Sequence, residues 1–138
     1  MAQTQGASLS WTISNFRVEE TAAGAATPAE ILPPNTSFDL KVDFDGSGAG
    51  WNALEIAGAS FTVKFYAEGI GAAANEIDFG SAAGNLSAGG GPYTGAFTVA
   101  AGITTEGVYR LGCLIEVSPG SGVVGFEENL LISVATGA

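Results

Sequence analysis

The clearest pattern in the chain is an alternation of apolar and polar positions between Glu106 and Ser118. A period of two is typical of a β-strand that is buried on one side. Turn-forming residues, Pro119 to Gly122, follow this strand, and the apolar segment Val123 to Val134 is expected to pair with it as a hairpin. Every second residue of the first strand belongs to one nearly pure apolar set: Tyr109, Leu111, Cys113, Ile115 and Val117.

The beginning of the chain predicts another strand, over residues 8–18. Leu9, Trp11 and Ile13 alternate with small polar residues and therefore share one face of it. Asn15 breaks this parity, so the strand is expected to contain a bulge or a bend.

The middle of the chain contains four more candidate strands and two segments without a strand pattern. Residues 21–35 are rich in Ala and Pro and are expected to form a long connection, with a poor short helix at Ala22 to Ala26 as an alternative. Trp51 to Ala59 is expected to be an irregular or short-strand segment. The remaining strands are expected at residues 38–44, 61–66, 77–79 and 93–101.

Seven short strands without a convincing helix predict a single all-β domain over residues 1–138. The expected architecture is an antiparallel seven-stranded sandwich with Greek-key connections, whose last six strands occupy residues 36–135. A β-barrel is the alternative that this pattern leaves open.

Three segments resemble strands of bacterial immunoglobulin-like domains: Phe38–Phe44 (FDLKVDF), Phe61–Glu68 (FTVKFYAE) and Gly107–Leu111 (GVYRL). The domain type is the CARDB, or cell-adhesion-related, kind, which is similar to a fibronectin type III sandwich. The resemblance covers about residues 36–134 and implies that Tyr109 is a corner tyrosine. The chain departs from it in having no second cysteine, no Trp on the strand at residues 61–66, and an insertion at Trp51 to Gly58. Such domains are mostly spacers, adhesive modules or assembly units.

Composition narrows the range of partners. The net charge is -10 and only 4 residues are Lys or Arg, so binding to nucleic acid or to an anionic membrane surface is not expected. Charged residues make up 13% of the chain, against about 25% in an ordinary soluble domain. The surface is therefore either rich in small uncharged residues or partly covered by another copy of the chain. The sequence shows no Sec-type signal and no membrane-spanning segment, which leaves a cytoplasmic location or export by another route open.

The chain contains no histidine, so Ser-His-Asp and Cys-His catalysis are excluded. An enzyme is therefore not expected, and neither is a cofactor. The single cysteine, Cys113, lies on the apolar face of its strand and is expected to be a buried, inert core residue.

Two acidic motifs are candidates for chemistry. Asp43, Asp45 and Ser47 place oxygens at alternate positions before a Gly, like the start of a calcium loop, but no carboxylate stands at the twelfth position. A solvated hairpin tip is the alternative. The adjacent Glu127 and Glu128 are expected to point to opposite faces of one strand, with Glu128 inward, and to protect a sheet edge.

These observations predict a non-enzymatic structural or interaction subunit that assembles with itself into a homo-oligomer, particle or fibre. The first strand either completes a sheet in a neighbouring copy or folds back on its own sheet. The alternative function is a small binding module for carbohydrate, peptide or Ca²⁺, with its site in the loops after strands 38–44 and 77–79. The expected partner-contact residues are Leu9, Trp11, Ile13, Trp51 and Tyr93.

Overall fold

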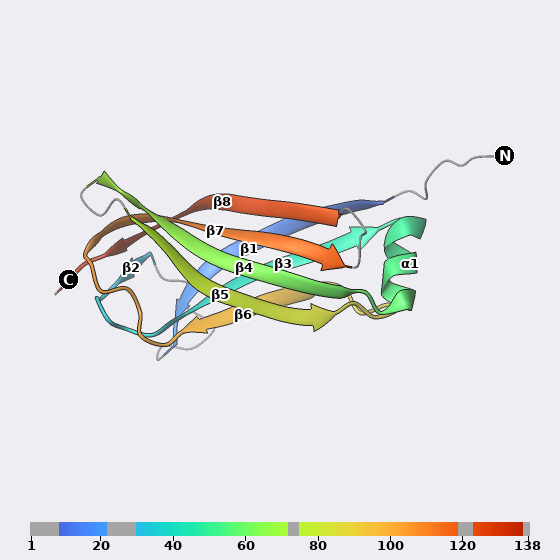
Figure 1. Cartoon of the computed structure of the whole chain (residues 1–138), viewed down its shortest axis with the longest axis horizontal. Helices are drawn as coiled ribbons and strands as arrows, with labels where there is room; N and C mark the ends of the chain where they lie inside the picture. The colour runs from blue at the N-terminus through green and yellow to red at the C-terminus, as the bar shows by residue number, and fades with distance from the viewer. Residues whose placement is uncertain (1–8, 22–29, 72–74, 119–122, 137–138) are drawn as a thin grey trace.

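The computed structural model of the chain is an elongated sandwich of two β-sheets with one short helix at one end (Figure 1). An all-β sandwich, predicted from the alternation, is confirmed. Eight strands occur among the described residues, one more than the seven that were predicted. The structure describes residues 9–21, 30–71, 75–118 and 123–136.

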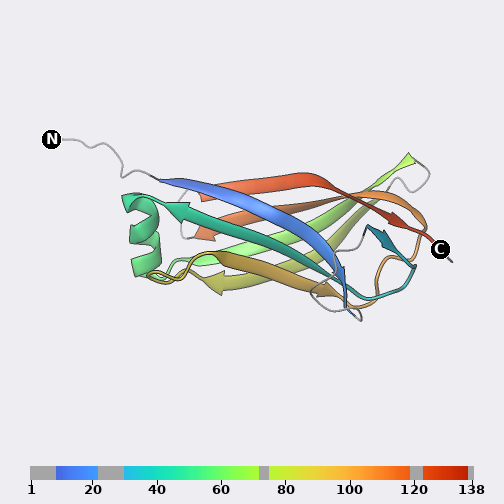
Figure 2. The same cartoon turned by 180° about the vertical axis from the view of Figure 1, so that it is seen from behind.

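The smaller sheet has three strands in the order β1-β3-β6 and lies in front in Figure 2. β3 is central, and its alternating side chains Phe38, Leu40, Val42 and Phe44 are all buried in the sandwich. Both neighbours pair with it in antiparallel fashion. The strands of this sheet are β1 (Ser10–Glu20), β3 (Phe38–Ser47) and β6 (Tyr93–Val99).

The predicted bulge in β1 is confirmed. The register between β1 and β3 shifts between Ser14 and Arg17, and Asn15 adopts a φ of 54° at this point. Asn tolerates this left-handed conformation better than most residues do. As a result, the charged side chains of Arg17 and Glu19 lie on the outer side of the sheet, and Val18 is buried.

The larger sheet has five strands in the order β2-β8-β7-β4-β5. The predicted hairpin is confirmed, because β7 and β8 pair in antiparallel fashion from Gly107–Val134 to Val117–Val123. Its turn, residues 119–122, lies outside the described residues. The strands are β2 (Ile31–Leu32), β8 (Val123–Val134), β7 (Gly107–Ser118), β4 (Ser60–Ile70) and β5 (Glu76–Asn85).

Two of these strands correct the prediction. The connection over residues 21–35 contains β2, which pairs in parallel fashion with the end of β8 because Leu32 is buried beside Val134. The possible helix at Ala22 to Ala26 lies outside the described residues. β5 is ten residues long rather than three, since its small residues 80–85 pair with β4 without a strong apolar signal.

The segment predicted as irregular is the helix α1 (Ala49–Ala57). Trp51 and Glu55 lie one turn apart on its buried face, and Gly58 ends the helix in a left-handed conformation with a φ of 66°. The helix covers one end of the sandwich (Figure 1). Within the described residues, no helix is long and apolar enough to cross a membrane.

The interior of the sandwich lies between the two sheets. Tyr109 is fully buried and its hydroxyl donates a 2.6 Å hydrogen bond to the backbone oxygen of Thr105, as expected of a corner tyrosine. Cys113 is also fully buried, and burial raises the pKa of its thiol to about 12. The thiol therefore stays protonated at neutral pH, which agrees with the prediction of an inert core residue.

Candidate interaction surface

The outer side of the five-stranded sheet carries most of the exposed large apolar side chains that the structure describes. Five of the seven described residues of this kind lie there, and Phe126 and Leu131 keep 66% and 53% of their surface exposed. The other two, Leu9 and Ile56, lie before β1 and on α1. We call this surface the apolar face; its apolar residues are Ile31, Ile70, Val108, Leu114, Phe126 and Leu131.

The register of the sheet brings these residues together. Val108 on β7 stands opposite Ile70 on β4, and Phe126 on β8 stands opposite Leu114 on β7. Residues directly opposite each other in antiparallel strands have Cβ atoms about 4.5–5.5 Å apart and share one face of the sheet. The exposed apolar residues therefore form cross-strand pairs, and the two pairs lie six residues apart along β7 with Arg110 between them.

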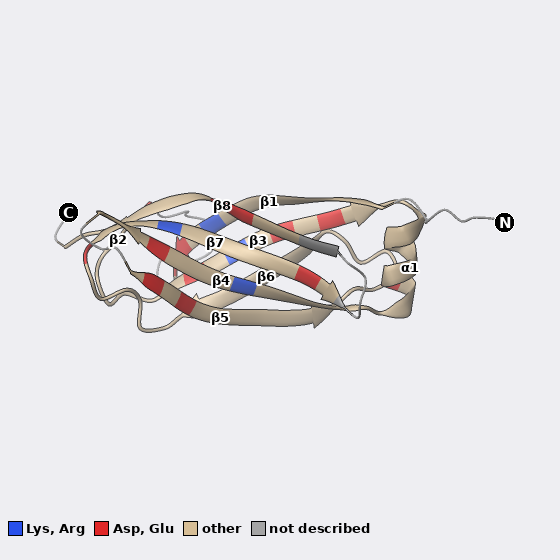
Figure 3. Ribbon diagram, turned by 45° about the horizontal axis from the view of Figure 1, so that its top comes forward, with Lys and Arg blue, Asp and Glu red and all other residues tan. Residues whose placement is uncertain are grey.

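Charged residues are interspersed among the apolar ones on this face, and Figure 3 shows both signs on its strands. Arg110 of β7 pairs with Glu68 of β4 at 3.7 Å. Lys64 of β4 pairs with Glu116 of β7 at 3.6 Å. All four side chains are about half exposed, so these pairs contribute little to stability. They place two of the four cations of the chain on the apolar face.

A tyrosine crosses the centre of the apolar face. The Tyr66 hydroxyl on β4 donates a 2.7 Å hydrogen bond to Glu128 Oε2 on β8. The ring lies directly over Gly112 of β7, where a Cβ atom would be only 2.4 Å from Tyr66 Cζ. Burial and the nearby Glu128 carboxylate raise the pKa of Tyr66 far above its ordinary value. A hollow of about 280 Å³ beside this ring is lined by Lys64, Phe65, Tyr66, Ala67, Glu76, Ile77, Asp78 and Leu114.

This contact corrects the prediction for Glu128. The register between β7 and β8 shifts between Leu111 and Cys113, so β8 gains one residue and Glu128 is exposed rather than inward. Glu127 stands opposite Cys113 and is half-buried. Both carboxylates lie on a bulged part of β8 that has no strand beyond it among the described residues, which fits the role predicted for them at a sheet edge.

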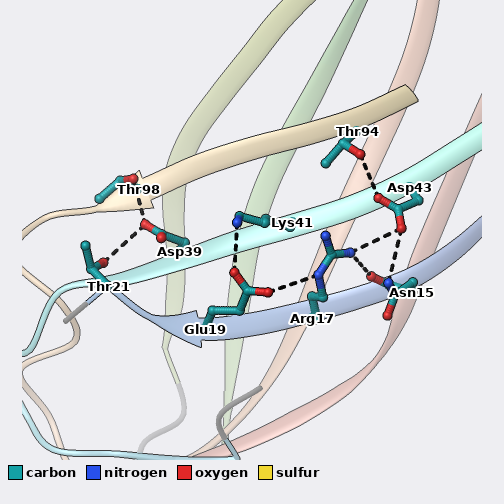
Figure 4. Close-up of polar contacts among 9 residues, drawn as sticks. All are labelled: Asn15, Arg17, Glu19, Thr21, Asp39, Lys41, Asp43, Thr94 and Thr98. Carbon is teal, nitrogen blue, oxygen red and sulfur yellow. Dashed lines mark hydrogen bonds and ion pairs between the residues drawn. The ribbon is translucent and has the colours of Figure 1, made fainter. Parts of the chain in front are cut away.

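The outer side of the three-stranded sheet differs, because its polar groups bind each other (Figure 4). Glu19 on β1 is only 3% exposed and lies between two cations: Arg17 Nε is 3.2 Å from Oε2, and Lys41 Nζ is 2.8 Å from Oε1. The Lys41 hydrogen bond, together with Arg17, lowers the pKa of the Glu19 carboxyl in spite of its burial.

The same network continues through two aspartates of β3. Asp43 accepts hydrogen bonds from Thr94 at 2.8 Å and Asn15 at 3.1 Å, and Arg17 lies 3.3 Å away. Burial raises the pKa of Asp43, but these donors and the Arg17 charge outweigh it and lower the pKa overall. Asp39 accepts hydrogen bonds from the hydroxyls of Thr21 and Thr98.

Acid is expected to weaken the fold through this network. The folded-state pKa values of Glu19 and Asp43 lie below the ordinary values of about 4.3 and 3.9, so the unfolded chain binds protons first as the pH falls. The stabilising contribution is complete above about pH 5 and is lost as the pH falls through the lowered values. Urea unfolding at a series of pH values measures this loss. A Glu19→Gln/Asp43→Asn variant should show a clearly smaller loss, and an equal loss would contradict the assignment.

The candidate calcium ligands do not form a loop. Asp43, Asp45 and Ser47 belong to β3, because pairing with β1 extends this strand to Ser47. Both oxygens of Asp43 accept hydrogen bonds, and Asp45 Oδ1 accepts one from the Gly46 amide at 2.8 Å. In the described part of the chain, no group of three or more Cys, Asp or Glu residues is placed to hold a metal ion.

The residues predicted to contact a partner are largely covered by the chain itself. Trp51 is 1% exposed and Tyr93 8%. Trp51 lies in α1, and the Tyr93 hydroxyl donates a 2.5 Å hydrogen bond to Glu55 Oε2, also in α1. They close the end of the sandwich and offer little surface to another molecule. The segment after β3, one of the two predicted binding loops, is this helix.

The first strand pairs with its own chain, antiparallel to β3 from Ser10–Ser47 to Glu20–Phe38, with the register shift between Ser14 and Arg17. Trp11 and Ile13 are half-buried, and Trp11 stacks on Trp51 with ring centroids 6.2 Å apart. Leu9 is 37% exposed. Of the five predicted contact residues, Leu9 therefore has the most free surface.

The apolar face itself was missed at the level of the sequence, although a signal for it exists. Val108 and Leu114 occupy the outward positions of the strand between Glu106 and Ser118, where polar residues are expected. Phe126 and Leu131 belong to the partner strand, and the bulge between them changes the parity. Outward apolar residues on two paired strands together indicate a contact surface.

No protein-family model and no curated protein matches the chain. Solved structures similar to it include a β-glucosidase from Listeria innocua in complex with gluconolactone, at 13% identity and a TM-score of 0.50, and the same enzyme in complex with glucose, at 14% identity and a TM-score of 0.49. Each match covers 93% of this chain and 16% of the β-glucosidase. The CARDB domain of a Pyrococcus furiosus protein in complex with di-metal ions matches at 13% identity and a TM-score of 0.43, over 96% of both chains.

This likeness corrects one prediction. The chain was expected not to be an enzyme, whereas the solved structures similar to it include a β-glucosidase, of whose length it spans 16%. At 13% identity the likeness shows the fold alone and assigns no glucosidase activity to this chain. The prediction that the chain is not an enzyme, which was based on the absence of histidine, is therefore not retained.

Proposed function

We propose that this chain is an interaction subunit that associates with a second copy of itself through the apolar face. The observation that carries the proposal is the concentration of exposed large apolar side chains on one side of one sheet, while the outer side of the other sheet is polar. Apolar patches that are rimmed by polar residues are typical of protein contact sites. The resemblance to immunoglobulin-like adhesive and assembly domains supports the same function.

The size of the face suits a dimer contact. Four strands at a spacing of about 4.8 Å and ten residues at about 3.3 Å each cover roughly 600 Å². A standard interface buries about 800 Å² per partner, so the face corresponds to a contact of modest size. Two sheets also pack well face to face, with their strands within about 30° of each other.

The face carries charges of both signs, with two cations beside the carboxylates of Glu68, Glu76, Asp78, Glu116 and Glu128. On β4, Lys64 and Glu68 carry opposite signs, and on β7, Arg110 and Glu116 do the same. A twofold axis at the centre of the face brings each strand against its equivalent, turned around, so that opposite charges can approach each other. The face thus mixes apolar side chains with charges of both signs and has the Tyr66–Glu128 hydrogen bond at its centre, while the chain as a whole is strongly acidic.

The variant Leu131→Lys tests the proposal. Leu131 is 53% exposed, so the fold should tolerate lysine, but a face-to-face dimer would have to bury its charge. We expect the wild-type chain of 13.8 kDa to sediment as a dimer or a larger species and Leu131→Lys to lose the face-to-face contact. The change in dissociation constant should be about tenfold or more.

Ile56→Lys is the matched control, because Ile56 is 77% exposed but lies on α1, away from the apolar face. It should associate as the wild type does. Equal effects of the two variants, or a wild-type chain that remains monomeric at high concentration, would contradict the proposal.

A further inference from the structure

The border of the sandwich formed by β5 and β6 differs from the opposite border (Figure 1). β5 pairs with β4 alone among the described residues, so one side of its backbone has no strand partner. Free edges attract other strands, and proteins commonly blunt them with charges, prolines or bulges.

The opposite border is blunted in this way. β1 contains a bulge and the charged residues Arg17 and Glu19, and β8 contains a bulge and the pair Glu127 and Glu128. β5 is protected only in its first half, where Glu76 and Asp78 precede an irregularity before Gly80. From Gly80 to Asn85 it carries no charge and no proline and keeps a regular register with β4.

We propose that residues 81–85 of β5 pair in antiparallel fashion with the same residues of a second copy. The two five-stranded sheets would then join into one continuous sheet, a form of strand addition. A twofold axis perpendicular to a sheet makes one residue face its own equivalent. Centring on Ala83 gives the longest ladder that avoids the irregularity: Ser81 faces Asn85, Ala82 faces Gly84, and Ala83 faces Ala83.

Charge supports this arrangement between two acidic chains. With Ala83 at the centre, Asp78 of one copy falls beyond Asn85, where β5 of the other copy ends. No carboxylate of the strand therefore faces another across the axis. Ser81, Ala83 and Asn85 are exposed and small, so the approach of a second backbone meets no bulky side chain on that side.

The β5 contact is additional to the apolar-face contact of the proposed function. It rests on that contact only for the assembly of species larger than a dimer. The apolar face is the outer side of the five-stranded sheet and the β5 edge is the border of that sheet, and each is proposed to bind its own equivalent in a second copy. Two different contacts of this kind alternate along a chain of subunits and give an open fibre or a closed ring with an even number of copies.

A charge-exchange experiment at Ala83 tests the contact directly. On the Leu131→Lys background the edge is the remaining proposed contact, and a dimer is expected by sedimentation. Adding Ala83→Glu or Ala83→Lys places two like charges opposite each other and should weaken this dimer about fivefold or more. An equimolar mixture of the two variants should restore it, because glutamate then faces lysine. Ala57→Glu and Ala57→Lys, at an exposed position of α1, are the matched controls and should change nothing.

The outcomes separate this contact from the apolar face. If the mixture associates no better than its components, or if Ala83→Glu behaves as Ala57→Glu does, the edge contact is overturned. The Leu131-dependent dimer then remains as the largest species and the proposed function is unaffected. If instead association depends on Ala83 and not on Leu131, the edge contact holds and the proposal for the apolar face fails.

Discussion

Replacing Trp51 with alanine is expected to lower the free energy of unfolding by about 3–5 kcal/mol, the usual cost of truncating a buried aromatic side chain. Trp51 is 1% exposed and stands between Trp11 and Tyr93, with ring centroids 6.2 and 6.3 Å away. It also lies on Gly46 of β3, where a Cβ atom would be 2.3 Å from Trp51 Cδ2. Alanine would leave a cavity bounded by residues of β1, β3 and β6, which the rigid strands cannot close.

Urea unfolding followed by circular dichroism measures this loss. Trp51→Phe should cost less, because it keeps a ring in the stack and removes an indole N–H that has no hydrogen-bond partner in the described structure. Asn52→Ala, at the exposed neighbouring position, should change stability by less than about 0.5 kcal/mol. A Trp51→Ala variant as stable as Asn52→Ala would show that α1 does not close the sandwich.

Sequence pattern predicted the strands that are buried on one side. β3, β7 and β8 begin or end where the alternation indicates, since a period of two is a direct consequence of the pleated backbone. The bulge at Asn15 was predicted for the same reason, because a break in parity requires an extra residue in the strand.

The helix α1 and the long β5 were not predicted, and the reasons differ. α1 is nine residues long, and its buried face consists mainly of Trp51 and Glu55, so its apolar period is too short to recognise. Glu55 is buried because of a tyrosine 38 positions later in the chain, which no local pattern can show. β5 consists of small residues over 80–85, and its strand conformation comes from pairing with β4 rather than from intrinsic propensity.

The outer sides of the two sheets show why the candidate site could not be predicted from local sequence pattern either. Outward positions of β3 and β4 are polar in the sequence. In the structure, Asp39, Lys41 and Asp43 of β3 bind residues from the neighbouring strands of their sheet. Lys64 and Glu68 of β4 instead stay exposed. Whether the outward polar residues of a sheet bind each other depends on the strand order, because such a network needs partners from three neighbouring strands. The distinction between a polar face and an interaction face therefore emerges only from the fold.

The second large effect is expected on the polar outer side of the three-stranded sheet. Glu19→Ala should lower the free energy of unfolding by about 2–4 kcal/mol. Breaking a fully buried ion pair costs roughly 3–5 kcal/mol, because the remaining charge is left without a partner. Here the carboxylate is 3% exposed, but Arg17 and Lys41 are 20% and 22% exposed and can recover some hydration. Arg17 also keeps Asp43 as a partner, so the expected loss falls slightly below that range.

The apolar face supplies the matched control for this prediction. Glu116→Ala and Glu68→Ala each remove the carboxylate of an ion pair, but these carboxylates are 43% and 56% exposed. Pairs of this kind contribute about 0–1 kcal/mol, so both variants should unfold nearly as the wild type does in urea at pH 7. The double variant Glu19→Ala/Lys41→Met should recover part of the loss, because it also removes the Lys41 cation that Glu19→Ala leaves without its carboxylate. Equal small effects of all three single variants would show that the Glu19 network is a solvated surface cluster and not a stabilising one.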